Sequence, residues 1–237
     1  MPTFGWPASD VLLACEPAKY VPLIPIGRIA VVNGTELGHY LDKMKEYEQV
    51  QATPSCSIND KAWMKNFIHV VGGADASEDL LFKNYMKTYE DIASDTLFGA
   101  TVETFKKEST ASVEQANGER IKTLLKEGTS LISYFGHSSA NTLAFNLSNP
   151  EVYENKGKYP FFCVSGCSAG NFFTYDLGRL ADNLSLSEKY VLAKDRGSIG
   201  FLADSHLGIP PYLDLYNKQL YGAFCRTLYG NTIGNQL

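Results

Sequence analysis

The chain has 237 residues, of which 44% are hydrophobic and 12% aromatic, and its net charge is −5 at pH 7. This length and composition predict one large folded domain or two small ones and exclude a disordered chain. The charges form no acidic or basic block, so we expect no nucleic acid and no membrane surface as a partner. No apolar stretch is as long as a spanning helix, so no membrane-spanning segment is predicted.

The sequence alternates between extended and helical patterns. Residues 20–32 are apolar and predict a strand, and a helix over 35–47 follows with Thr35 as its N-cap. Further on, short apolar runs predict strands, and apolar residues at helical spacing predict helices. In chain order these elements are a strand at 67–71, a helix at 80–92, a strand at 100–105, a helix at 112–127, strands at 129–135 and 161–165, another helix, a strand at 198–203 and a helical tail at 211–228.

This alternation predicts an α/β fold with a mainly parallel sheet and helices on both of its faces. In such folds ligands bind outside the carboxyl ends of the strands. Two buried strands end there in reactive residues, because the strand at 129–135 leads into His137 and the strand at 161–165 leads into Cys167. If these two strands are neighbours, the thiol and the imidazole meet at one edge of the sheet.

A thiol beside an imidazole predicts nucleophilic catalysis. The imidazole stabilises the thiolate, takes up its proton and later returns it to a leaving amine. Small residues surround both groups, among them Gly136, Ser138 and Gly166. They let a substrate approach closely and leave backbone N–H groups free to hold an oxyanion.

The remaining cysteines and histidines have simpler interpretations. The spacing of the five cysteines fits neither a dense disulfide pattern nor a zinc site, and an odd number predicts at least one free thiol. Cys163 lies among aromatic and apolar residues, which predicts an inert core residue. His39 in a helix and His69 in a strand are expected to be structural. His206, which follows the strand at 198–203, is a weaker rival base.

Two segments resemble the motifs of a known family. ISYFGHSSANTLAF (132–145) resembles the histidine motif of the gingipain-like cysteine peptidases, family C25 of the caspase-like clan, and YPFFCVSGCSAGNFF (159–173) resembles their cysteine motif. The frame of that second motif fits Cys167 and does not fit Cys163. Other segments that fall in the family's order are Ser9-Asp10, IPIGRIAV (24–31), KEYE (45–48), WMKNFIHVVGG (63–73) and GSIGFLA (197–203).

The resemblance implies a caspase-like, three-layer sandwich that hydrolyses peptide bonds through an acyl-enzyme. Cys167 is the implied nucleophile and His137 the implied base and then acid, with oxyanion donors on the backbone around Gly136, Ser138, Gly166 and Cys167 itself. The substrate is a peptide or protein, and no cofactor and no metal are expected. Export by the type IX secretion route, with its components as partners, implies a secreted or outer-surface location.

The resemblance also suggests a specificity residue. Family members that cleave after basic residues hold the substrate's charge with a carboxylate from the acidic stretch after the Gly-Gly turn, which here is GGADASEDLL (72–81). Asp79 matches that position best and Asp75 is the second candidate, whereas Glu78 beside the predicted N-cap Ser77 is expected to support the helix start.

This chain departs from the family at two positions. Ser138 replaces the glycine that often follows the histidine. Val71 stands where some members carry a carboxylate that orients the histidine, so a third catalytic residue is open, with Asp75 as a candidate.

The resemblance further predicts the domain organisation. Residues 1–20 are expected to be the edge of a truncated preceding α/β subdomain, and residues 21–237 the catalytic subdomain. Two alternatives share the scaffold. One is a sortase-type transpeptidase, which passes the acyl group to an amine instead of water. The other is a non-catalytic binding module.

Overall fold

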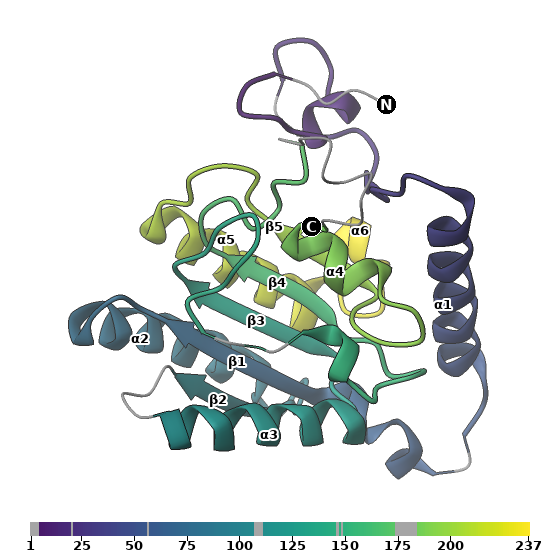
Figure 1. The fold of residues 1–237 in the computed structure, drawn as a ribbon, viewed down its shortest axis with the longest axis vertical. Helices are drawn as coiled ribbons and strands as arrows, with labels where there is room; N and C mark the ends of the chain where they lie inside the picture. Colours follow the sequence, from purple (N-terminus) through teal and green to yellow (C-terminus); the bar gives the residue numbers. More distant parts are fainter. Residues whose placement is uncertain are drawn as a thin grey trace.

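The computed structural model describes residues 5–19, 21–55, 57–106, 111–145, 147, 149–173 and 184–237. These residues form a five-stranded sheet with the order β2-β1-β3-β4-β5, in which all neighbouring strands are parallel (Figure 1). The strands are β1 (Asn66–Gly72), β2 (Thr101–Lys106), β3 (Leu131–Gly136), β4 (Phe161–Ser165) and β5 (Gly200–Ala203). The predicted parallel α/β fold is therefore confirmed.

Helices cover both faces of this sheet. The α-helices are α1 (Gly34–Ala52), α2 (Ala76–Ala93), α3 (Ala111–Glu127), α4 (Leu186–Leu192), α5 (Pro210–Gly222) and α6 (Ile233–Gln236). Short 3-10 helices are η1 (Val11–Ala14), η2 (Ile58–Lys65) and η3 (Pro150–Val152), and one π-helical turn, η5 (Ala223–Thr227), continues α5. The predicted helices near 35–47, 80–92, 112–127 and 211–228 are all present.

The core has two halves, one on each face of the sheet. Residues of α3 and α4 pack on one face, here named the α3/α4 face, and residues of α2 and α5 pack on the other, the α2/α5 face (Figure 1). Successive side chains of a strand point to opposite faces. On β3, Ile132 and Tyr134 join the α3/α4 face, while Leu131 and Phe135 join the α2/α5 face. This alternation decides on which side of the sheet each strand delivers the residues that follow it.

The strand order reverses between β1 and β3. The chain passes from β1 outward to β2, and then returns to the other side of β1 to form β3, β4 and β5. A reversal of this kind leaves a crevice between the connections that follow the two strands, and this is the usual ligand site of open α/β sheets. We therefore expect the residues that follow β1 and β3 to form the functional site.

Helix α1 lies beside the sheet, and a buried lysine is one of the residues that attach it. Lys43 is 2% exposed, and its Nζ donates hydrogen bonds to the carbonyls of Val191, Ala193 and Arg196 at 2.7, 2.9 and 2.9 Å. An ammonium has three N–H donors, so these carbonyls satisfy the group completely. The contact ties α1 to the last turn of α4 and to the segment that follows it.

The structure corrects three local predictions. Residues 21–32 form no strand of the sheet, and the only pairing there is an isolated bridge between Cys15 and Pro22; residue 20 lies outside the described residues. Prolines at 22 and 25 remove N–H donors that a strand needs. The N-cap of α1 is Asn33, not Thr35, and the N-cap of α2 is Asp75, not Ser77.

Candidate active site

The two reactive loops touch at the carboxyl edge of the sheet. β3 and β4 are neighbours, with Phe135 paired to Ser165, so His137 and Cys167 each follow two residues beyond this pair. The Ser138 hydroxyl donates to the Cys167 carbonyl at 2.8 Å. A Cβ on Gly166 would lie 2.3 Å from the Ser138 Oγ, so only glycine permits this approach. This glycine therefore serves contact between the loops, in addition to any room that it leaves for a substrate.

The His137 imidazole contacts a carboxylate from the first turn of α2. Nε2 lies 2.8 Å from Glu78 Oε2, and both side chains are partly exposed. Glu78 also accepts a hydrogen bond from the backbone N–H of Ala74 at 2.9 Å, and this bond, with the contact to His137, lowers the pKa of Glu78. The ring of Phe82 packs edge-on against the imidazole. His137 is thus held from the β1 side of the crevice.

Glu78 is the site residue that the sequence analysis missed. Its position near the start of α2 predicts a residue that supports the helix start, and this interpretation accounts only for its bond to Ala74. Its contact with His137 follows from the order of the strands, because α2 follows β1 at the strand-order reversal and His137 follows β3 at the same crevice. Val71, which offers the imidazole no carboxylate, is fully buried in the core. Asp75, the other candidate for the third residue, caps α2 by accepting from the N–H groups of Ser77 and Glu78.

Cys167 lies in a partly exposed, strained turn. Its Sγ donates to the carbonyl of Gly208 at 3.9 Å, and the next residue, Ser168, has a φ of +58°. A non-glycine residue in this left-handed region is strained, and such strain clusters at functional sites. The Ser168 N–H donates to the carbonyl of His206 at 2.7 Å, which fixes the turn against the loop after β5. His206 itself is exposed, and its backbone, rather than its ring, contacts the turn.

Two backbone donors are unused beside these groups. Within the described residues, the N–H groups of Ser138 and Cys167 have no hydrogen-bond acceptor. The Ser138 hydroxyl donates to the Cys167 carbonyl and not to a group near its own N–H. The backbone N–H of Ser138 therefore stays free, as it would with glycine at this position. Unpaired N–H groups next to a nucleophile have the chemistry that an oxyanion requires.

Cys163 is buried in the core, whereas Cys167 is partly exposed. It is 3% exposed, its Sγ lies 3.5 Å from Asn217 Oδ1, and burial raises the pKa of its thiol to about 12. The prediction of a core cysteine is confirmed, and its low reactivity stays a prediction. Among the described residues the free cysteines are Cys15, Cys163, Cys167 and Cys225, which also confirms a free thiol; Cys56 lies outside the described part of the chain. His69 is fully buried against the Tyr221 hydroxyl, as a structural histidine should be.

The acidic residues after β1 all have partners in the fold. Asp79 accepts the Gly73 N–H with Oδ1 at 3.0 Å, and a Cβ on Gly73 would clash with that oxygen. Together with the capping bonds of Asp75, this contact closes the turn between β1 and α2. In Asp75 and Asp79 alike, one carboxylate oxygen therefore accepts local backbone hydrogen bonds. The predicted role of these two residues in substrate specificity stays a prediction.

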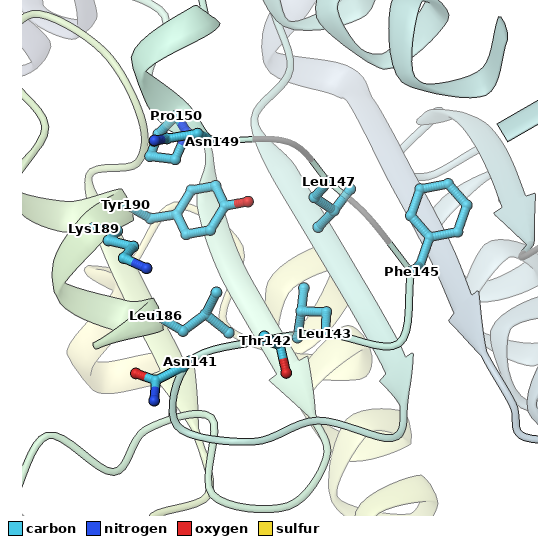
Figure 2. Close-up of a pocket in the computed structure, with 10 residues that line it drawn as sticks. All are labelled: Asn141, Thr142, Leu143, Phe145, Leu147, Asn149, Pro150, Leu186, Lys189 and Tyr190. Carbon is cyan, nitrogen blue, oxygen red and sulfur yellow. The ribbon is translucent and has the colours of Figure 1, made fainter. Parts of the chain in front are cut away.

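A separate cavity of about 320 Å³ lies beyond the histidine loop. Figure 2 shows Leu143 and Leu147 of that loop facing Leu186 and Tyr190 of α4 across the space. These residues belong to or pack against the α3/α4 half of the core. The Glu78 contact lies on the α2/α5 side, so the cavity and the histidine's carboxylate partner are on opposite faces of the sheet.

The described residues contain neither a metal-binding cluster nor a membrane-spanning helix. Among these residues no three His, Cys, Asp or Glu side chains are grouped to hold a metal ion. In the same part of the chain, every helix is too short or too polar to cross a bilayer.

A parallel sheet covered by helices on both faces defines a caspase-like α/β fold, and a thiol and an imidazole follow two neighbouring strands of that sheet. The family model for peptidase family C25 matches residues 1–237, and the chain therefore belongs to that family. No curated protein matches it in sequence.

Solved structures agree on the fold. The crystal structure of the Arg-specific cysteine proteinase gingipain R aligns with a TM-score of 0.70 at 15% identity and covers 98% of this chain. The complex of the pro- and mature domains of gingipain RgpB from Porphyromonas gingivalis aligns with a TM-score of 0.66 at 16% identity over 93% of the chain. The chain spans about half the length of these proteins, 52% and 50% respectively.

Proposed function

We propose that this chain is the catalytic part of a cysteine endopeptidase with Cys167 as nucleophile and His137 as general base and acid. The observation that carries the proposal is the delivery of both residues by neighbouring parallel strands to loops that bond to each other through Ser138 and Cys167. Membership of family C25 supports the same chemistry. The substrate is a peptide or protein, and the reaction needs no cofactor.

The reaction proceeds in two halves. The Cys167 thiolate attacks the scissile carbonyl carbon, the imidazolium of His137 gives its proton to the leaving amine, and the C–N bond breaks to leave a thioester. The imidazole then takes a proton from water, the water oxygen attacks the thioester, and the S–C bond breaks to restore the thiolate. Free N–H groups at Ser138 and Cys167 hold the oxyanion in both halves, with Gly136 and Gly166 shaping the backbone beside them.

Glu78 has a supporting role in this proposal. Its carboxylate accepts from Nε2 of the ring, so Nδ1 is the nitrogen that exchanges protons with the thiol and the substrate. It acts on His137 and not on the substrate, so it is a positioning residue. It fills the role for which no carboxylate is present at Val71.

The domain organisation and location also remain proposals. Residues 21–237 form the catalytic subdomain, and residues 1–20 belong to the edge of a preceding subdomain. Exposed apolar side chains at Val21, Leu23 and Ile24 favour a further covering surface there. Secretion to the cell surface by the type IX route, with its components as partners, rests on the family resemblance.

Product analysis tests the proposed reaction. The purified protein is incubated with a peptide library and an added amine, and mass spectrometry identifies the products. We expect hydrolysed peptides, loss of hydrolysis in C167A and H137A, and full activity in the matched cysteine variant C15S. Amine-coupled products would instead identify a transpeptidase, and unchanged peptides with retained binding would identify a binding module.

A further inference from the structure

A buried tyrosine of β3 bonds to the backbone of the loop that carries the catalytic imidazole. Tyr134 is 1% exposed, and its ring lies in the α3/α4 half of the core. Its hydroxyl donates to the carbonyl of His137 at 2.5 Å and accepts the N–H of Ala144 at 3.1 Å. One hydroxyl therefore contacts both ends of this loop.

The His137 carbonyl has a second donor. The Ala144 N–H also donates to it, at 2.9 Å, and this is one of the bonds that flank the antiparallel bridge between Ser138 and Leu143. In a pair of this non-hydrogen-bonded type, the N–H of each residue points away from its partner. The Ser138 N–H therefore points out of the loop.

The His137 carbonyl and the Ser138 N–H belong to one peptide group. The peptide bond is planar and trans, so its C=O and its N–H point in opposite directions. Bonds that fix the carbonyl therefore fix the direction of the N–H as well. Donors to a carbonyl also polarise the peptide group and strengthen its N–H as a donor. The Ser138 N–H, which has no acceptor within the described residues, is one of the two proposed oxyanion donors.

The neighbouring strand β1 leaves room for the hydroxyl. Gly72 pairs with Gly136, and a Cβ on Gly72 would collide with the Tyr134 hydroxyl. The Gly72 carbonyl accepts the His137 N–H at 2.9 Å, so the backbone of the histidine is held at both its N–H and its carbonyl. Burial raises the pKa of Tyr134, so the hydroxyl keeps its proton and stays a donor at neutral pH.

We propose that Tyr134 is a positioning residue for the oxyanion: its hydroxyl orients and polarises the peptide group between His137 and Ser138, and so aims the Ser138 N–H at the developing negative charge. The inference rests on the proposed peptidase function, because only attack by Cys167 on a carbonyl creates that charge. Its role differs from that of Glu78, which contacts the imidazole and not the peptide group.

Tyr134→Phe tests this role, because it removes the hydroxyl and keeps the buried ring. We expect kcat for a fluorogenic peptide to fall by about 5- to 30-fold, with KM unchanged within about twofold, because removal of an oxyanion donor itself costs about 10²- to 10³-fold. Alkylation of Cys167 by iodoacetamide forms no oxyanion, so its rate should stay within about twofold of wild type. Unchanged hydrolysis in Y134F, or equal slowing of hydrolysis and alkylation, would overturn the assignment.

Tyr153→Phe is the matched control. Tyr153 is buried in the same half of the core, and its hydroxyl also donates to a backbone carbonyl, that of Leu147, which is not part of the catalytic loop contact. Y153F therefore loses a bond of the same kind at another place. It should leave both kcat and the alkylation rate unchanged, and a loss of kcat equal to that of Y134F would show a general effect of packing and overturn the assignment.

A spectroscopic measurement separates this inference from the proposed chemistry. The chain has four histidines, and only His137 is followed by serine, so labelling with carbonyl-¹³C histidine and amide-¹⁵N serine gives one NMR cross-peak, from this peptide group. In Y134F we expect its carbonyl resonance to move upfield, because one of two hydrogen bonds is lost, and Y153F should leave it in place. An unmoved cross-peak in Y134F overturns the assignment whatever the activity. A wild-type protein that cleaves no peptide refutes the proposed function, and a moved cross-peak then still supports the orientation of this peptide group by Tyr134.

Discussion

The contact between His137 and Glu78 gives a prediction with a defined magnitude. Glu78→Gln removes the negative charge and keeps the length of the side chain. The side chain of His137 is 53% exposed and that of Glu78 is 37% exposed. Pairs with this exposure contribute about 0.2 to 1 kcal/mol, because water and salt screen them.

This magnitude corresponds to a loss of about 1.5- to 5-fold in kcat/KM for E78Q. A buried carboxylate behind a catalytic histidine contributes far more, about 10⁴-fold in the serine-protease triad. The pKa of Glu78 is lowered, so the carboxylate stays ionised as the pH falls through the ordinary range of a glutamate, and the contact persists in mildly acidic buffer. We therefore expect E78Q to lower kcat by the same modest factor at pH 6 and pH 8, with KM unchanged.

The assay is steady-state hydrolysis of a fluorogenic peptide, with thermal unfolding measured on the same samples. Asn33→Ala is the matched control, because it removes the N-cap of α1, whose side chain accepts from the Glu36 N–H, and leaves α2 and the imidazole untouched. It should destabilise the protein by about 1 kcal/mol and leave kcat/KM unchanged. A loss above 100-fold in E78Q, or an equal loss of activity in N33A, would refute a positioning contact of this strength.

Three further predictions concern reactivity and stability. Iodoacetamide at neutral pH should label Cys167 and spare Cys163, whose pKa is raised to about 12; mass spectrometry that finds both labelled equally would contradict this. Burial raises the pKa of Asp204, the first residue after β5, to about 6, so the folded state binds its proton more tightly and the stability contributed by protonation is lost as pH rises from about 4 to 6; Cys163 and Tyr216, which face it, titrate far above that window. D204N should therefore be more stable than wild type at pH 7.5, by about 1 kcal/mol after solvent screening, and should unfold at a higher temperature. At pH 4 the two proteins should have the same stability. Lys43→Met should cost about 2 to 4 kcal/mol in urea unfolding, because three carbonyls lose their donor, and no loss of stability would show that water replaces the ammonium.

The periodicity of the sequence was sufficient to predict the sheet and most helices. The runs at 67–71 and 161–165 became β1 and β4, because a fully apolar strand between two helical layers has few alternatives. The same reasoning failed at 21–32, where the residues are apolar but a strand also needs a neighbour and free N–H groups. Periodicity indicates which side chains of a segment can be buried, but it does not indicate whether a neighbouring strand is available to pair with the segment.

The positions of His137 and Cys167 at the ends of neighbouring strands could be predicted from the sequence, and the carboxylate contact of His137 could not. His137 and Cys167 each follow a recognisable strand, so local patterns lead to them. Glu78 is 59 residues from His137 in the chain, and its contact depends on the order of β1 and β3 in the sheet.

The alternation of side chains along the strands limits which insertions and deletions the family can accept. Phe135 and Cys163 pack on the α2/α5 side, and His137 and Cys167 lie two and four residues beyond them. One residue inserted into β3 or β4 would turn the reactive side chain to the opposite face, whereas residues added to the connections between elements leave it in place. In distant relatives the interval from the last core residue of a strand to its reactive residue should therefore be constant, while the intervals between motifs vary in length.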